Sequence, residues 1–124
     1  MKLRCVRLIS PATGEVLSRG SLRVGVEYPV LEIVLPRGEN VLVRVFEEED
    51  ADTPGLWPVA MFEPVPSRVP ANWYPQVDEP GGTIRIGPES WLRSGFWEAY
   101  FEGDALARAD FQKELRELTG SAGS

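Results

Sequence analysis

The spacing of prolines between residues 64 and 80 restricts the fold of this chain more than any other feature. These residues read PVPSRVPANWYPQVDEP. Proline lacks a backbone N–H and has a fixed φ, which excludes it from helix interiors and from central strands. The segment is therefore expected to be an ordered strap, held by its apolar side chains, which are Val69, Trp73, Tyr74 and Val77.

The clearest hairpin lies before the strap. Residues 25–35 (GVEYPVLEIVL) are rich in β-branched side chains, and period-two alternation places Leu31, Ile33 and Leu35 on one face. Residues 36–40 (PRGEN) supply a loop, and the valines of 41–46 alternate with Leu42, Arg44 and Phe46. Further short strands are expected within residues 2–10, 59–63 and 83–86, and a small hairpin around residues 10–17.

The last third of the chain has helical patterns. Residues 104–120 place Asp104 at the N-cap and Gly120 just beyond the end. One apolar stripe of this helix contains Ala107, Phe111, Leu115 and Leu118. A shorter helix before it would begin at Ser94 as N-cap and end at Gly103.

Four aromatic residues crowd the shorter helix. Helical spacing pairs Phe96 with Tyr100 and Trp97 with Phe101, so all four share one broad face. This face is expected to cover the core at one end of the barrel. The alternative is that an edge of Trp97 or Tyr100 is exposed and anchors a partner, as these residue types do at interfaces.

Strands followed by helices predict an α+β fold. We expect a small antiparallel, partly open SH3-like β-barrel followed by two C-terminal α-helices. One domain would span residues 1–120, with the barrel in 2–65, the strap and a short strand in 66–88, the helical part in 89–119 and a frayed tail in 121–124.

Several kinds of chemistry are disfavoured. The chain has no histidine, which removes histidine-based triads and the commonest transition-metal ligand. Its single cysteine, Cys5, is expected to be a buried, inert thiol. Carboxylate pairs could still do acid–base work, and the candidates flanked by apolar residues are Glu32, Glu63, Glu98 and Glu102. Strands this short leave little room for a cleft, so we expect no enzymatic activity and no cofactor.

Charge points to the class of partner. The formal net charge is −6, which disfavours nucleic acid and anionic membranes and would attract a basic protein. The acidic run EEEDADTPG at 47–55 matches part of a calcium loop, with Asp50, Asp52 and Gly55 in place, but Met61 stands where a bidentate Glu is required. A solvated turn, a weak cation site and a patch that docks a basic surface all remain open.

The cellular compartment is expected to be the cytoplasm. One cysteine allows no internal disulfide, the N-terminal residues lack the apolar core of a signal peptide, and no apolar run is long enough for a membrane span.

Three short motifs bring a family resemblance. They are Pro70-Ala71-Asn72-Trp73, Gly87-Pro88 followed by Trp91, and Gly95-Phe96-Trp97-Glu98 continuing through Phe101 to Asp104. Together with the strand region from Val24 to Val65, they resemble small bacterial proteins, some of them similar to immunity proteins encoded beside polymorphic toxins. The resemblance implies binding and blocking of a cognate toxin.

The leading hypothesis is a non-enzymatic immunity protein whose partner is a toxin with a basic active-site cleft. The candidate partner-binding residues are Glu47, Glu48, Glu49, Asp50 and Asp52 for steering, with Trp57 and Trp97 as anchors. The alternative is an adaptor or assembly subunit whose barrel face or strap docks in a larger complex. A third possibility, a small-molecule site, would require a pocket with convergent polar groups.

Overall fold

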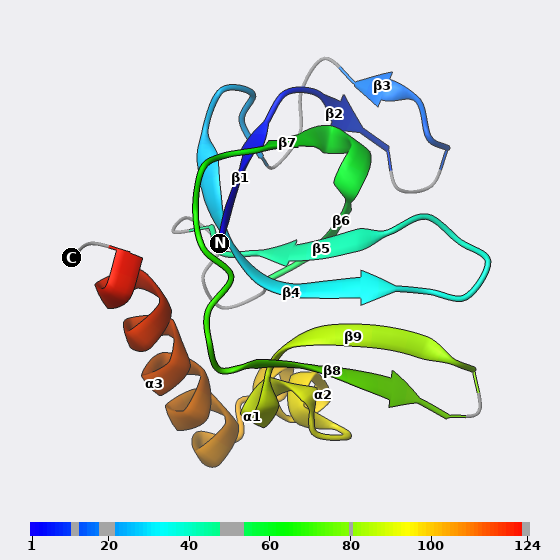
Figure 1. Ribbon diagram of the computed structural model, residues 1–124. Coiled ribbons are helices and arrows are strands. Elements are labelled where there is room, and N and C mark those ends of the chain that lie inside the picture. Colours follow the sequence, from blue (N-terminus) through cyan, green and yellow to red (C-terminus); the bar gives the residue numbers. More distant parts are fainter. Residues whose placement is uncertain (11–12, 18–21, 48–53, 80, 123–124) are drawn as a thin grey trace.

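The computed structural model describes residues 1–10, 13–17, 22–47, 54–79 and 81–122, and it confirms an α+β chain with antiparallel strands followed by helices (Figure 1). The nine strands within these residues are β1 Lys2–Cys5, β2 Leu8–Ile9, β3 Val16–Leu17, β4 Glu27–Leu35, β5 Leu42–Val45, β6 Leu56–Pro58, β7 Phe62–Pro64, β8 Trp73–Asp78 and β9 Thr83–Pro88. A 3-10 turn, η2 Val59–Met61, joins β6 to β7. The helices are α1 Glu89–Leu92, α2 Phe96–Phe101 and α3 Ala105–Ala122, one more than expected.

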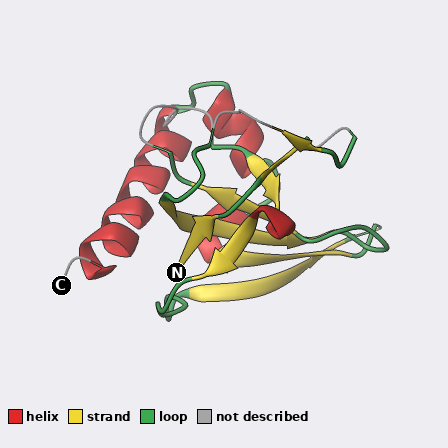
Figure 2. Ribbon diagram, turned by 90° about the horizontal axis from the view of Figure 1, so that it is seen from above, coloured by secondary structure: helices red, strands yellow, loops and turns green. Residues whose placement is uncertain are grey.

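Strand β4 organises the sheet. One edge of β4 pairs with β5, and its other edge is divided between β1 at the start of the strand and β9 at its end. The order β6-β5-β4-β1-β7 curves into a partly open barrel, while β9 and β8 extend the sheet from the far half of β4. Viewed from above, the β4–β5 and β8–β9 hairpins extend away from α3 (Figure 2).

A register shift between Val30 and Glu32 interrupts β4, because Leu31 is an extra residue opposite β5. Such a bulge turns two consecutive side chains to one face, and here these are Leu31 and Glu32, which both face the helices. Val30 packs in the barrel, Leu31 packs among the helices, and Ile33 again contacts the barrel cluster. The prediction that Leu31, Ile33 and Leu35 share one face was therefore wrong, because simple alternation does not continue through the bulge.

The expected strap is shorter than predicted. Residues 73–78 form β8, which pairs with β9 from Trp73 opposite Pro88 to Asp78 opposite Thr83. Within the described residues β8 has no second neighbour, so it is an edge strand. An edge strand accepts proline where the missing N–H would point outward, and Pro75 lies in this strand. Only residues 65–72 remain as a strap, which descends from β7 to β8 alongside α3 (Figure 1).

The ends of α2 and α3 follow only some of the capping residues that the sequence predicted. Gly103 has a φ of 86° and closes α2: the Gly103 N–H donates to the carbonyl of Tyr100, and the Asp104 N–H to that of Ala99. Asp104 then caps α3, accepting a 2.9 Å hydrogen bond from the Ala107 N–H. The Ser94 cap was wrong, because α2 begins at Phe96 after Gly95, whose φ is 79°. Helix α3 also continues past Gly120, to Ala122.

Two hydrophobic clusters lie on opposite sides of the sheet. The barrel cluster includes Leu3, Cys5, Val30, Val43 and Val45. The helical cluster packs the predicted stripe of α3 against α1, α2 and β4; its members are Leu31, Trp91, Phe96, Trp97, Tyr100, Ala107, Phe111 and Leu115. Three of the four aromatic residues of α2 are buried, and Phe101 is 44% exposed. The aromatic face is therefore mainly a core face.

Candidate functional site

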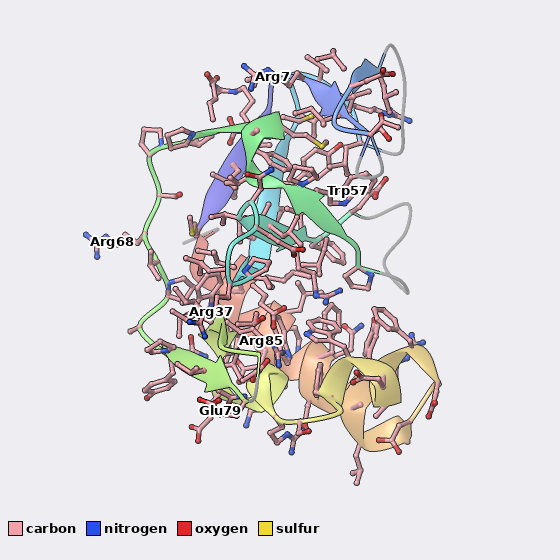
Figure 3. All side chains as sticks on the ribbon, turned by 90° about the vertical axis from the view of Figure 1, so that its right-hand side faces the viewer. Arg7, Arg37, Trp57, Arg68, Glu79 and Arg85 are labelled. Atoms are coloured by element: carbon pink, nitrogen blue, oxygen red, sulfur yellow. The ribbon has the colours of Figure 1, made fainter. Side chains whose placement is uncertain are left out.

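The structure separates the two predicted anchors. Trp57, in β6, is half-buried and packs against the barrel cluster. Trp97, in α2, is 7% exposed and belongs to the helical cluster on the other face of the sheet. Trp97 thus presents no exposed ring. Figure 3 labels Trp57, which belongs to β6. Of the predicted acidic residues, Glu47 is half-buried, and Glu48, Glu49, Asp50 and Asp52 lie outside the described residues.

A buried carboxylate lies at the centre of the sheet's helical face. Glu32 is 1% exposed and follows Leu31 in the bulge of β4. Its Oε2 accepts hydrogen bonds from Arg85 Nη2 at 2.8 Å and Nε at 3.2 Å, and from Trp97 Nε1 at 3.3 Å. Its Oε1 lies 3.6 Å from Arg44 Nε. One carboxylate therefore faces two arginines.

Arg44 connects this carboxylate to α2 and to the end of the acidic run. Its guanidinium lies 4.2 Å from the ring centroid of Trp97, a cation–π contact. Its Nη1 donates to the carbonyl of Pro54 at 2.7 Å. Burial lowers the pKa of Arg44, and the neighbouring Glu32 carboxylate opposes that shift. The chain that follows residues 47–53 is thereby fixed next to Trp97.

Arg85 connects the same carboxylate to α1. Its Nη2 donates to the carbonyl of Trp91 at 2.9 Å, and its Nη1 to that of Leu92 at 3.4 Å. Cations are favourable at a helix C-terminus, where carbonyl groups lack intrahelical partners. Its Nη1 also lies 3.6 Å from Asp78 in β8. Arg85 thus holds together β9, β4, β8 and α1.

A hollow of about 620 Å³ opens beside this network. We call it the helix-side groove. Its lining comes from β4, β5, β6, the β8–β9 hairpin and residues 93–98, and includes Glu32, Arg44, Gln76, Asp78, Glu79, Arg85, Arg93, Trp97 and Glu98. Figure 3 shows Glu79 and Arg85 at the same end of the molecule as α2, far from Arg7 at the opposite end.

Exposed charge around the helix-side groove is mostly acidic. Glu79 and Glu98 are exposed, and the side chain of Asp78 is 38% exposed. The exposed cation is Arg93, which pairs with Asp110 of α3 through Nη2 and donates from Nε to the carbonyl of Ser90. Among the described residues of the lining, exposed or half-exposed carboxylates therefore outnumber exposed cations.

A second hollow, of about 850 Å³, lies between the strap and α3. We call it the strap groove. Its lining is mainly apolar along the strap, at Val65, Pro66, Val69 and Pro70, and carries Glu114 and Glu117 on α3. Asn72 bridges the two sides, because its Nδ2 donates to Glu114 Oε2 at 2.8 Å. Figure 3 shows Arg68 projecting outward from the strap.

The other candidate acids and Cys5 have structural surroundings. Glu63, in β7, pairs with Arg4 at 2.8 Å on the barrel surface. Glu98 lies in α2 and Glu102 at its end, and Glu32, in β4, is bonded to Trp97 of α2. Cys5 is fully buried as predicted, and its pKa is raised by burial. Among the described residues no group of three or more Cys, Asp or Glu side chains is arranged to hold a metal ion.

Sequence reasoning missed the buried ion network. The sequence pattern indicates Glu32 only as an acid flanked by apolar residues, and it does not connect Arg44 or Arg85 to that acid. The available signal was a single charge inside each of three apolar strand patterns, LEIV, LVRV and TIRI. Charges are rarely buried without partners, so these three could have been paired.

Comparison with protein families, curated proteins and solved structures finds no match. In the part of the chain that the structure describes, no helix has the length and apolar character needed to cross a membrane.

Proposed function

We propose that this chain is a non-enzymatic protein-binding domain that acts as an immunity protein, neutralising a toxin with a basic active-site cleft. The observation that carries the proposal is the acidic entrance of the helix-side groove, where Asp78, Glu79 and Glu98 surround a hollow of about 620 Å³. An acidic surface steers a basic partner and raises its association rate.

The engagement of Glu32 supports binding over catalysis. A general base must lie within hydrogen-bond reach of the proton it takes. Both oxygens of Glu32 face arginine side chains, and Oε2 also accepts from Trp97. This carboxylate is placed to hold strands and helices together, and it leaves the surface acids for recognition.

The acidic run would add to this surface. Pro54, which directly follows residues 47–53, is bonded to Arg44, and Arg44 lines the helix-side groove. Glu47 directly follows the half-buried Phe46, which packs against the helical cluster. Both ends of the acidic run therefore adjoin residues on the helical face of the sheet, where the helix-side groove lies. We propose that Glu47, Glu48, Glu49, Asp50 and Asp52 steer the partner, with Trp57 contributing at the barrel side.

The test is capture of the partner by the tagged chain from its native lysate, at low and at high salt, with identification by mass spectrometry. One stoichiometric partner with a basic cleft, lost at high salt, is the expected result. A toxicity assay then asks whether the purified chain blocks that partner's activity. Capture of a partner that stays fully active would overturn the immunity proposal.

The strap groove favours a second candidate, an adaptor or assembly subunit. Val69 is 58% exposed on the strap, beside a hollow of about 850 Å³. Exposed apolar side chains around a hollow are typical of docking sites. In this case the same capture would recover several subunits of one complex, and Val69→Asp would reduce their recovery while Glu79→Gln would not.

A further inference from the structure

We propose that the helix-side groove receives one cationic side chain, a lysine or preferably an arginine, from a basic protein segment. This inference rests on the proposed function in taking the partner to be basic. It goes further by naming the pocket and the chemical group that enters it.

The first argument is the balance of donors and acceptors. Each N–H-bearing side chain of the groove's described lining makes at least one hydrogen bond within the chain, and the one buried N–H without a hydrogen bond, Arg44 Nε, faces Glu32 Oε1 at 3.6 Å. Gln76 donates from Nε2 to Asp78 Oδ1 at 2.9 Å and to the Leu92 carbonyl at 2.8 Å. The other engaged donors are Arg44, Arg85, Arg93 and Trp97. Because the Gln76 amide group uses its N–H side internally, its Oε1 is left to accept.

The second argument is charge. Glu32 and Asp78 together balance the two buried arginines, because Glu32 faces both Arg44 and Arg85 and Asp78 lies 3.6 Å from Arg85. Glu79 and Glu98 add two exposed negative charges to the lining, and Arg93 is already paired with Asp110. A ligand that is positive and rich in donors complements this surface, whereas an anion would meet carboxylates at the entrance.

The third argument is size and shape. A volume of about 620 Å³ falls within the range of roughly 300–1,000 Å³ that ligand pockets have. It holds a long side chain together with part of its flanking backbone. Arginine suits it better than lysine, because a planar guanidinium donates to several acceptors at once, and the groove offers the Gln76 carbonyl and the two exposed carboxylates of Glu79 and Glu98.

Nuclear magnetic resonance of the whole chain tests the proposal with a defined probe. The probe is the blocked peptide acetyl-Gly-Arg-Gly-amide, and the matched control replaces arginine by citrulline, which has the same shape without the charge. The arginine peptide is expected to shift the Gln76 side-chain amide and the Trp97 indole N–H in a saturable manner, and the citrulline peptide is not. Equal binding of both peptides, or shifts confined to the strap groove, would overturn the proposal.

Two double variants distinguish binding in the groove from non-specific attraction by the net negative charge of the chain. Glu79→Gln with Glu98→Gln is expected to weaken binding of the arginine peptide about fivefold, as removal of exposed ion pairs does. The control is Glu15→Gln with Glu39→Gln, which changes the net charge equally at exposed positions outside the groove and is expected to alter binding less than about twofold. An equal loss in both double variants would contradict a defined site. Binding of the corresponding glutamate peptide would assign the groove to anions.

The two proposals fail in different ways. If the captured toxin binds the Glu79, Glu98 double variant as tightly as it binds the unchanged chain, the groove proposal is wrong and the immunity proposal stands. If the arginine peptide binds in the groove but capture yields a partner that stays fully active, the groove proposal stands and the immunity proposal is wrong.

Discussion

The guanidinium of Arg44 lies over the indole of Trp97, 4.2 Å from its ring centroid, while the same arginine bonds to Pro54 and faces Glu32. One strand residue thus contacts α2, the segment after the acidic run, and the central strand. The arrangement explains why the tryptophan expected at an interface is buried: an arginine from β5 covers it. Changes to Glu32 or Trp97 should therefore affect folding before they affect binding.

Removal of the Glu32 carboxylate is expected to be strongly destabilising. Glu32→Ala leaves Arg44 and Arg85 buried without their shared partner, which should lower the free energy of unfolding by roughly 3–5 kcal/mol. Urea unfolding followed by tryptophan fluorescence measures this. Glu63→Ala is the matched control, because its pair with Arg4 is exposed and is expected to contribute less than about 1 kcal/mol. Similar losses in both variants would contradict a structural role for Glu32.

The two tryptophans predicted as anchors, Trp57 and Trp97, should contribute differently to the stability of the fold. Trp97→Ala opens a cavity in the helical cluster and should lower the free energy of unfolding by roughly 3–5 kcal/mol. Trp57→Ala should cost less, because that ring is only half-buried. Binding to the captured partner is then measured on the folded Trp57 variant. A stable Trp97→Ala chain with reduced affinity would show instead that Trp97 is an interface residue.

Cys5 is expected to make stability fall in alkaline solution. Burial raises the pKa of the folded thiol, so above the unfolded value of about 8.5 the unfolded chain loses its proton first. The unfolded state then binds fewer protons than the folded state, and the free energy of unfolding decreases as the pH rises towards the folded pKa. Chemical unfolding between pH 7 and 10 measures the effect, with Cys5→Ala as control. The same slope in both chains would remove Cys5 as its cause.

Charge reversal of the acidic run tests steering. Replacing Glu47, Glu48, Glu49, Asp50 and Asp52 by lysine should slow association with the captured partner and reduce the dependence of the rate on salt. Dissociation should change less, because long-range attraction acts mainly on encounter. Stopped-flow mixing at several salt concentrations gives both rates. Unchanged association kinetics would exclude the acidic run from recognition.

Local patterns predicted much of the fold. The hairpin of β4 and β5 follows from alternation and the PRGEN loop, and the stripe of α3 from helical spacing. Asp104 was predicted as a cap, and it accepts from the Ala107 N–H. These features depend on residues near each other in sequence, where backbone geometry alone decides which side chains meet.

Features that depend on distant residues were not predictable in the same way. Glu32 meets Arg85 across 53 positions of sequence and Trp97 across 65, and no periodicity encodes those distances. Pro75 suggested a strap because edge and central strands cannot be told apart before the sheet is assembled. The helix-side groove was unexpected for the same reason, since its lining comes from many separate elements.

The bulge in β4 also has a consequence for how this chain tolerates loss of a residue. Val30 pairs with Val45 and Glu32 with Arg44, so Leu31 is an insertion that the ladder does not need. Deleting Leu31 should preserve the pairing of β4 with β5 both before and after the bulge. Deleting Val34 should instead displace the end of β4 relative to β5. The cost of losing Leu31 should fall on the helical cluster, where it is fully buried. Hydrogen exchange on the shortened chain should therefore show protected β4 and β5 amides but faster exchange in α2 and α3.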